Sequence, residues 1–137
     1  MKVLFVCTGN TCRSPMAQGI AKNLFPQNEF LSAGIFAKDN SPASENAVIA
    51  MKNMGIDISE HKARQITKQL INEVDFIVPM TDNHLYTLLQ AGVDKNKIKL
   101  FSTPVPDPFG QSLKAYEQTA KILKENIQKL FGEKSDN

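Results

Sequence analysis

The chain has 137 residues, of which 42% are hydrophobic and 22% charged, and its formal net charge at pH 7 is only +2. This length predicts one domain over residues 1–137, and the small charge argues against a nucleic-acid partner or an anionic membrane surface. No apolar run approaches the ~20 residues of a membrane span, and two cysteines exclude a disulfide framework, so we expect a protein of the reducing cytoplasm.

Strand and helix patterns alternate along the chain. Residues 2–6 form an apolar run typical of a strand buried on both faces. A polar loop over 7–13, here called the anion loop, precedes a helix to about Phe25, with Ser14 predicted as N-cap and Pro15 as first helical residue. The later elements are, in chain order, a strand over 29–33, a helix over 41–55, a short helix from the cap Thr67 to about Asn72, a strand over 74–79, a helix from the cap Thr81 to near Gly92, a strand over 98–101, a proline-rich loop over 102–110 and a helix from near Ser112 to Gly132.

This alternation predicts a parallel sheet covered by helices on both faces, in one α/β domain. Ligands of such sheets bind beyond the carboxyl ends of the strands, where the anion loop lies. The final helix carries a single core-facing stripe of apolar residues. Its members are Leu113, Tyr116, Ala120, Leu123, Ile127 and Leu130, and the five residues after Gly132 are expected to fray.

The anion loop has the residue types of an oxyanion site. A strand, a short glycine loop and a helix N-terminus gather backbone N–H groups around an anion. Cys7 supplies a thiol, which ionises more readily beside a cation or at a helix N-terminus and could then attack phosphorus to form a thiophosphate. Arg13 supplies a bidentate cation for phosphate oxygens. The loop therefore predicts phosphoryl transfer to sulfur.

Other residues of the anion loop allow more than one interpretation. Gly9 permits close backbone approach or positive φ and Asn10 tolerates a left-handed conformation, although an ordinary turn explains both equally well. Ser14 could cap the helix and also donate its hydroxyl to the Cys7 sulfur. Cys12 could form a protective disulfide with Cys7 or simply pack.

An acid for the leaving group is the remaining requirement of such an enzyme, and it must later serve as a base for water. Asp107 is the candidate, because the prolines on either side of it restrict where its carboxylate can point. An ordinary turn aspartate before proline fits the same pattern. No metal site is predicted, since the two cysteines, His61 and His84 lack ligand spacing.

Residues 6–15, Val-Cys-Thr-Gly-Asn-Thr-Cys-Arg-Ser-Pro, followed by Asp107-Pro108, resemble the low-molecular-weight protein tyrosine phosphatase family. The resemblance covers nearly the whole chain and extends to residues 32–34 and 61–67. It implies a three-layer α/β/α fold with a four-stranded parallel sheet of order 2-1-3-4, phosphorylated protein substrates, and no metal or cofactor. We expect a monomer.

The same resemblance assigns roles to residues of this chain. It implies Cys7 as nucleophile, Arg13 as phosphate clamp and Asp107 as general acid and base. The residues that it implies for binding phosphate are Thr8, Gly9, Asn10, Thr11, Cys12, Arg13 and Ser14. The residues that it implies for holding the loop are Asn10, Ser14, Ser32 and His61.

Within the family, Thr11 and the pair Phe109-Gly110 resemble the bacterial protein-arginine phosphatase branch; many tyrosine-specific members carry an aliphatic residue in place of Thr11. A threonine oxygen suits a polar guanidinium beside the phosphorus. Phe36 and Phe109, as pocket walls, could stack on a guanidinium or on a phenyl ring. We therefore favour phosphoarginine as substrate, with phosphotyrosine as the alternative.

Three further functions fit less well. A thiol-linked arsenate reductase needs more cysteines, and none follows Cys12. A non-catalytic redox sensor or phosphate-binding module would not need Cys7, Arg13 and Asp107 together. A nucleotide-binding loop would end in Gly-Lys-Ser/Thr, which is missing.

Overall fold

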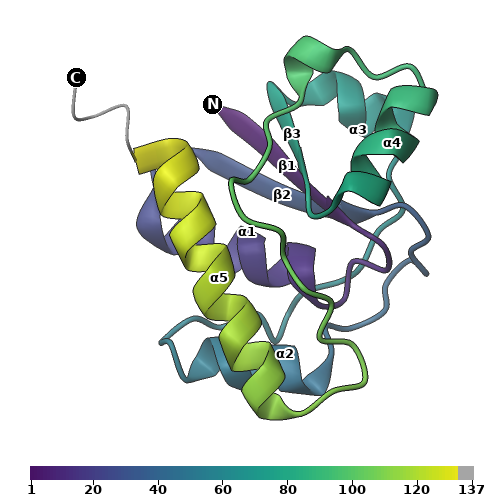
Figure 1. Cartoon of the computed structure of the whole chain (residues 1–137). Coiled ribbons are helices and arrows are strands. Elements are labelled where there is room, and N and C mark those ends of the chain that lie inside the picture. The colour runs from purple at the N-terminus through teal and green to yellow at the C-terminus, as the bar shows by residue number, and fades with distance from the viewer. Residues whose placement is uncertain (133–137) are drawn as a thin grey trace.

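The computed structural model of the chain describes residues 1–132, so the fraying expected of the last five residues lies outside the described part. Three parallel strands, β1 (Lys2–Cys7), β2 (Glu29–Gly34) and β3 (Phe76–Pro79), form a sheet of order β2-β1-β3 (Figure 1). The parallel α/β architecture is therefore confirmed, with a sheet of three strands.

The fourth strand expected over 98–101 is wrong. The segment makes a single parallel bridge, between Ile77 and Ile98, and Lys99 N–H donates to the Ile77 carbonyl oxygen over 2.9 Å. Leu100 is already 53% exposed. The segment thus leaves the sheet edge after one pair, and its apolar residues Ile98 and Phe101 pack partly buried against the two cores instead of extending a strand.

Helices cover both faces of the sheet (Figure 1). Those on one face are α1 (Arg13–Leu24), α2 (Glu45–Lys52) and α5 (Leu113–Gly132). Those on the other face are α3 (Lys68–Glu73) and α4 (Asp82–Gln90), which is followed by a 3₁₀ turn, η1 (Lys95–Lys97). No helix in residues 1–132 combines the length and the apolarity that crossing a bilayer requires.

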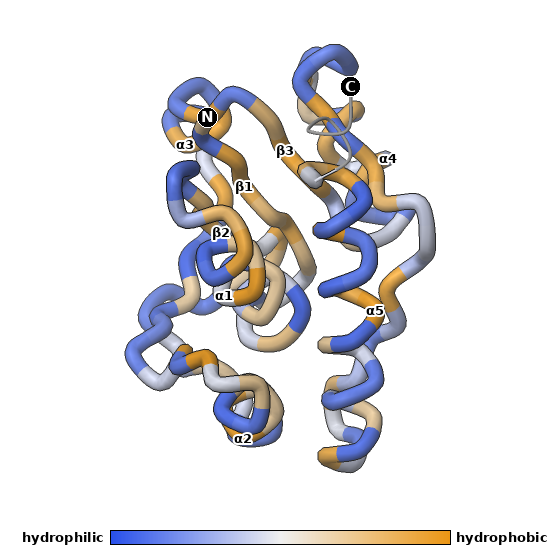
Figure 2. Tube along the Cα trace, turned by 90° about the vertical axis from the view of Figure 1, so that its left-hand side faces the viewer, coloured by the Kyte–Doolittle hydropathy of each residue, from blue (hydrophilic) through white to orange (hydrophobic). Residues whose placement is uncertain are grey.

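The two cores meet at β1. Val3 and Phe5 pack into the core under α1 and α5, whereas Leu4 and Val6 pack into the core under α3 and α4. All four are fully buried, which explains why consecutive residues of this strand are apolar (Figure 2).

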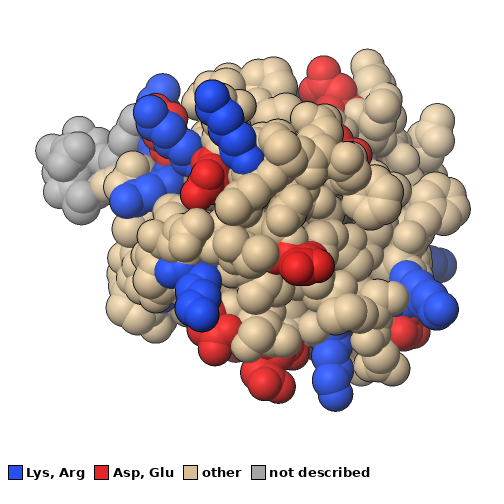
Figure 3. Space-filling model, turned by 90° about the horizontal axis from the view of Figure 1, so that it is seen from below, with Lys and Arg blue, Asp and Glu red and all other residues tan. Residues whose placement is uncertain are grey.

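The predicted apolar stripe of α5 is confirmed. Tyr116, Ala120, Leu123 and Ile127 are buried in the first core, and Leu113 and Leu130, at the two ends of the stripe, are partly buried against it. On the face seen in Figure 3, Lys and Arg side chains are interspersed with Asp and Glu, in keeping with the small net charge.

Two predicted caps are confirmed. The Thr67 hydroxyl accepts from Leu70 N–H at the start of α3, and that of Thr81 accepts from His84 N–H at the start of α4. Gly92, with φ of +89°, lies just beyond the end of α4, as expected of a residue that ends a helix.

The predicted start of the second helix is wrong. The helix begins at Glu45 rather than Ser41. The residues before it are paired elsewhere, because Pro42 forms an antiparallel bridge with Lys62 and Ser44 N–H donates to the Thr11 carbonyl oxygen. The helix ends at Lys52 instead of Gly55.

The first helix begins at Arg13 with Cys12 as its N-cap residue, so Ser14 and Pro15 lie inside it and Ser14 is not its cap. The Ser14 hydroxyl is instead engaged by Cys7 and Asn10.

Gly34, the last residue of β2, lies against the anion loop. A Cβ atom on Gly34 would stand 2.6 Å from the Thr8 carbonyl oxygen and 3.0 Å from the Asn10 nitrogen. Both obstacles are backbone atoms, which a small side-chain movement cannot relieve. This position therefore has to be glycine for the loop to pack on the sheet.

We expect Gly34→Ala to lower the free energy of unfolding by roughly 1–3 kcal/mol, the usual effect of overpacking, in urea denaturation. Gly132→Ala is the matched control, since its Cβ would meet Phe25 at an ordinary 3.6 Å. If the free energy of unfolding of Gly34→Ala lies within about 0.5 kcal/mol of the parent value, this account of the loop is contradicted.

Candidate active site

A cavity of about 230 Å³ opens at the carboxyl end of β1. The residues that line it are Cys7, Thr8, Gly9, Thr11, Cys12, Arg13, Asp107 and Phe109. Six of these belong to the anion loop and two come from the loop before α5. The structure thus brings together in one cavity the three residues expected to do chemistry.

Unpaired backbone N–H groups surround this cavity. Among residues 1–132, none of the N–H groups from Thr8 to Cys12 donates to a protein acceptor. Backbone donors without a protein acceptor, next to a helix N-terminus, are typical of an anion site. The loop can therefore offer several hydrogen bonds to one oxyanion.

Ser14 lies directly beside the Cys7 sulfur. The Ser14 Oγ is 2.9 Å from Cys7 Sγ and also accepts from Asn10 Nδ2 over 2.8 Å. A Cys7 thiolate can only accept, so against the ionised sulfur the Ser14 hydroxyl is the donor. Such a bond stabilises negative charge on sulfur, both before attack and when sulfur leaves.

Asn10 is the residue of the anion loop with a left-handed backbone, at φ of +57°, and it is fully buried. Its Oδ1 accepts from Arg64 N–H over 2.9 Å, and its carbonyl oxygen lies 2.7 Å from His61 Nε2. Gly9 does not have positive φ, and a Cβ there would meet only Thr11, at 3.7 Å. The residue of this loop that adopts positive φ is therefore Asn10 and not Gly9.

His61 acts as a donor to the anion loop. Burial lowers the pKa of His61, as do the charges of Arg64 and Lys22, while its bond to Asn10 opposes them. The ring is therefore neutral near pH 7, and its Nε2 hydrogen donates to the Asn10 carbonyl oxygen.

Arg13 is 5% exposed and spans the cavity toward the loop before α5. Its Nη1 donates to the Val105 carbonyl oxygen over 3.3 Å, and its Nη2 is 3.6 Å from Asp107 Oδ2. The Asp107 Oδ1 accepts from Phe109 N–H over 3.1 Å, which fixes the carboxylate in its turn. Asp107 therefore reaches the anion loop across 94 positions of sequence.

The two aromatic residues expected as pocket walls occupy different places. Phe109, which is 70% exposed, lines the cavity that contains Cys7. Phe36, which is 82% exposed, lines an adjoining cavity of about 410 Å³ that shares Thr8, Arg13 and Asp107 with the first. Both rings are free to cover a substrate side chain.

Ser32 is engaged outside the anion loop. Its hydroxyl donates to Gln18 Oε1 over 2.6 Å, and its carbonyl oxygen accepts from Arg64 Nε. Ser32 thus links α1 and β2, and its connection to the loop runs through Arg64, whose own N–H holds Asn10.

Cys12 packs in a small polar network that the sequence did not reveal. Its sulfur lies 3.0 Å from Ser44 Oγ and 3.4 Å from the Tyr116 hydroxyl, and the thiols of Cys7 and Cys12 are both free. Burial, and then the bond with Cys12, raise the pKa of Tyr116 to about 12. The Tyr116 hydroxyl therefore keeps its proton and can donate to sulfur.

His84 was also missed as a site residue. Its Nε2 lies 2.9 Å from Thr8 Oγ1 and its Nδ1 lies 3.0 Å from Thr81 Oγ1. A neutral ring donates from one of these nitrogens and accepts at the other, so His84 joins Thr8 to Thr81 by two hydrogen bonds. Its sequence signals were its position three residues after a helix cap and the run Met80-Thr81 before it, which also resembles the protein-arginine phosphatase branch, but neither gave it a role in the site.

Among residues 1–132, no group of three or more His, Cys, Asp and Glu side chains is placed to hold a metal ion. The chemistry of the cavity can be stated from its own groups. A sulfur nucleophile, a buried cation, a carboxylic acid and unpaired amides suffice for transfer of a phosphoryl group to sulfur and then to water.

Known proteins match nearly the whole chain. Residues 2–136 fit the family model described as low molecular weight phosphotyrosine protein phosphatase. The protein-arginine-phosphatase of Bacillus subtilis is 35% identical over 142 residues, which cover 95% of this chain and 94% of that protein. The low molecular weight protein-tyrosine-phosphatase PtpB of Staphylococcus haemolyticus is 35% identical over 136 residues, which cover 95% and 97%.

A solved structure agrees closely with the fold. It is a mutant of the YwlE arginine phosphatase with a phosphorylated active-site serine. Its TM-score is 0.91 at 32% identity, and the match covers 100% of this chain and 97% of that chain. These names include both arginine and tyrosine phosphatases, so the similarity does not decide between phosphoarginine and phosphotyrosine as substrate.

His84 predicts a specific pH dependence of stability. Burial, and then the charge of Arg13, lower its pKa from 6.5 to about 4, although Asp107 opposes this. Between these values the unfolded chain takes up a proton that the folded chain does not. Stability from this group is therefore complete above pH 6.5 and declines as the pH falls toward 4.

We expect His84→Gln to lose about 0.5–1.5 kcal/mol of unfolding free energy near neutral pH, through the bond to Thr8. That deficit should shrink as the pH falls from 6.5 to about 4, when urea unfolding is followed at each pH. Parallel stability profiles of the parent and His84→Gln would show that His84 does not titrate in this way.

Proposed function

The chain belongs to the low molecular weight phosphotyrosine protein phosphatase family, and from that premise we propose that it hydrolyses phosphoarginine in proteins through a thiophosphate on Cys7. The wider activity, that of a metal-independent cysteine phosphatase acting on phosphorylated proteins, follows from the family. The roles of individual residues and the choice of phosphoarginine are the content of the proposal.

In the first step the Cys7 thiolate attacks phosphorus from the floor of the cavity. An S–P bond forms and the P–N bond to the guanidinium breaks, while Asp107 gives its proton to the departing nitrogen. Arg13 and the unpaired N–H groups of the anion loop hold the phosphoryl oxygens.

In the second step Asp107 takes a proton from water as the water oxygen attacks phosphorus. The S–P bond breaks, and phosphate leaves with the cavity restored. The Ser14 hydroxyl, 2.9 Å from the sulfur, stabilises the thiolate that departs. The phosphorylated active-site serine of the related arginine phosphatase mutant supports the same covalent route.

The observation that carries the choice of phosphoarginine is the position of Thr11 in the wall of the cavity. Its Oγ1 has only a long contact of 3.8 Å, to Cys12 Sγ, so the hydroxyl is available to a substrate. A guanidinium bears N–H groups next to the bridging nitrogen, and a hydroxyl oxygen accepts from them. A phenyl ester offers no donor at that place.

Phosphotyrosine is the second candidate, on two observations. The exposed rings of Phe36 and Phe109 can stack on a phenyl group as well as on a guanidinium. A relative of equal identity also bears the name of a tyrosine phosphatase. Direct comparison of the two substrates on one enzyme decides between them.

Thr11→Val removes the hydroxyl and keeps the shape of the side chain. We expect the ratio of kcat/KM for phosphoarginine to that for phosphotyrosine to fall roughly 2- to 12-fold, the value of one hydrogen bond. Thr11→Ser is the control, because it keeps the hydroxyl and should keep the ratio. If the ratio is the same in Thr11→Val and the parent, the Thr11 hydroxyl does not select phosphoarginine and the proposed substrate loses its support.

Asp107→Asn tests the acid. We expect kcat/KM to fall roughly 100- to 10,000-fold for phosphoarginine, and much less for p-nitrophenyl phosphate, whose leaving group departs without a proton. The parameter kcat/KM reports the first chemical step, so the comparison isolates leaving-group protonation. Equal losses for both substrates would assign Asp107 a structural role.

A further inference from the structure

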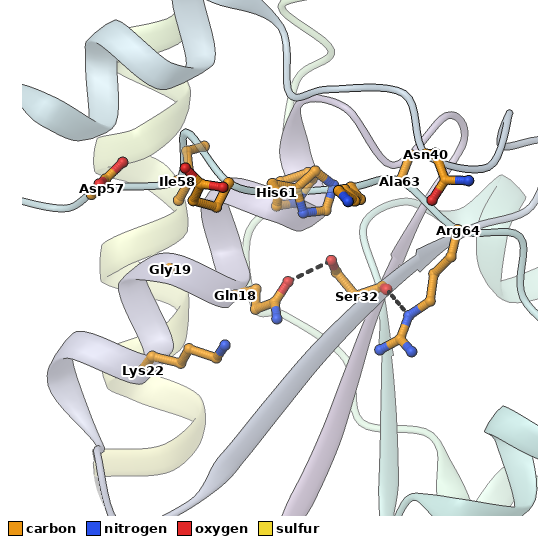
Figure 4. A pocket seen from close by; sticks show the side chains of 13 residues that line it. Gln18, Gly19, Lys22, Ser32, Asn40, Asp57, Ile58, His61, Ala63 and Arg64 are labelled. Atoms are coloured by element: carbon orange, nitrogen blue, oxygen red, sulfur yellow. Dashed lines mark hydrogen bonds between the residues drawn. The ribbon is translucent and has the colours of Figure 1, made fainter.

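A second polar cavity, which we call the basic cavity, shares no lining residue with the cavity of Cys7. It measures about 520 Å³ and lies between the later turns of α1, the end of β2 and residues 57–64 (Figure 4). Nothing in the proposed catalytic cycle uses it. Its size exceeds that of the catalytic cavity, and its walls are rich in polar side chains.

Two cations point into the basic cavity from different elements. Figure 4 shows the ammonium of Lys22, on α1, and the guanidinium of Arg64 reaching toward the region of Gln18 and Ser32 from opposite sides. In residues 1–132 neither forms an ion pair. Arg64 donates through Nε to the Ser32 carbonyl oxygen, and no protein acceptor takes a bond from its two Nη groups.

The charged side chains that line the cavity are three cations and two carboxylates, a formal sum of +1. Lys62 also lines the cavity, as do the carboxylates of Asp57 and Glu60. Asp57 is engaged with its own turn, where it accepts from Ser59 N–H over 2.8 Å. The two charges that act on His61, those of Arg64 and Lys22, are both positive and lower its pKa.

The basic cavity and the anion loop share a wall. His61 and Arg64, which line the cavity, make the two bonds that hold Asn10 from outside the loop. Asn10 in turn holds Ser14, which lies beside the nucleophilic sulfur. A ligand that orders residues 61–64 would therefore also order the anion loop.

We propose that the basic cavity binds the phosphate group of a small organic phosphate monoester, between Lys22 and Arg64, and that its occupancy raises the activity of the anion loop. Lysine and arginine are the residues that bind phosphate, arginine through paired donors. Gln18 adds an amide, and Ile58 gives an apolar surface for the organic part. The binding claim is independent of which phosphorylated side chain the enzyme hydrolyses.

The test uses glycerol 2-phosphate as probe on enzyme whose Cys7 thiol has been alkylated with iodoacetamide, so that the adduct blocks the catalytic cavity and binding at Cys7 does not interfere. Backbone amide resonances of Gly19, Ile58 and Arg64 are followed by NMR during the titration. We expect saturable shifts at these positions. Sodium chloride at the same ionic strength should not reproduce them.

The variants identify the binding groups. Because Lys22 is exposed, Lys22→Gln should lower the affinity for glycerol 2-phosphate roughly two- to fivefold. Lys22→Glu should lower this affinity further. Lys121→Gln, on the exposed face of α5, is the matched control and should change nothing. Shifts that salt reproduces, or that survive Lys22→Glu unchanged, would overturn the proposed site.

A second readout tests the coupling to the anion loop. With a saturating phosphorylated protein as substrate, in place of a small monoester that could itself enter the basic cavity, the probe should raise kcat in the parent and lose this effect in Lys22→Glu. A probe that only raises KM competes at the catalytic cavity, and that outcome would overturn the coupling. These results leave the roles of Cys7 and Asp107 untouched, so failure here is distinguishable from failure of the proposed function.

Discussion

Asn10 stands in a left-handed conformation with no exposed surface, and the geometry of the site depends on how it is held. Its side chain accepts from Arg64 N–H and donates to Ser14, and its carbonyl oxygen accepts from His61. These bonds turn the loop so that its own N–H groups remain unpaired around the cavity, and they hold the Ser14 hydroxyl beside Cys7. The hydrogen bonds from His61 and Arg64 stabilise the left-handed conformation of Asn10.

Arg13 connects this loop with the other half of the site. It is almost fully buried, and it contacts both the Val105 carbonyl oxygen and Asp107. When a phosphoryl group enters, the same guanidinium can exchange its carboxylate partner for phosphate oxygens, which leaves Asp107 beside new negative charge. In the proposed mechanism, Arg13 thus positions Asp107 before substrate binds and the phosphoryl group afterwards.

The sequence predicted those features that depend on local pattern. The doubly buried run of β1, the anion loop after it, the caps Thr67 and Thr81 and the stripe of α5 all follow from neighbours in the chain. The family resemblance named Ser14 and His61 with Asn10, but the Arg64 bond to Asn10 and the contact of His84 with Thr8 depend on tertiary packing, which spacing does not encode. The second helix was predicted to start early because Ser41-Pro42 looks like a helix start, yet that segment pairs with Lys62. The fourth strand was predicted from the apolar residues of 98–101. That segment makes one bridge, Ile77 with Ile98, so its apolar character did not indicate continued pairing.

The most direct test of the central claim is mass spectrometry of Asp107→Asn enzyme quenched in denaturant during turnover of p-nitrophenyl phosphate. Its leaving group departs without a proton, so the intermediate should form readily and accumulate because its hydrolysis lacks the base. The account predicts one phosphoryl group on the peptide that contains Cys7, attached to that sulfur, and none when Cys7→Ala enzyme is treated in the same way. A phosphoryl group on any other residue, or product released in a burst with Cys7 unmodified throughout, would contradict it.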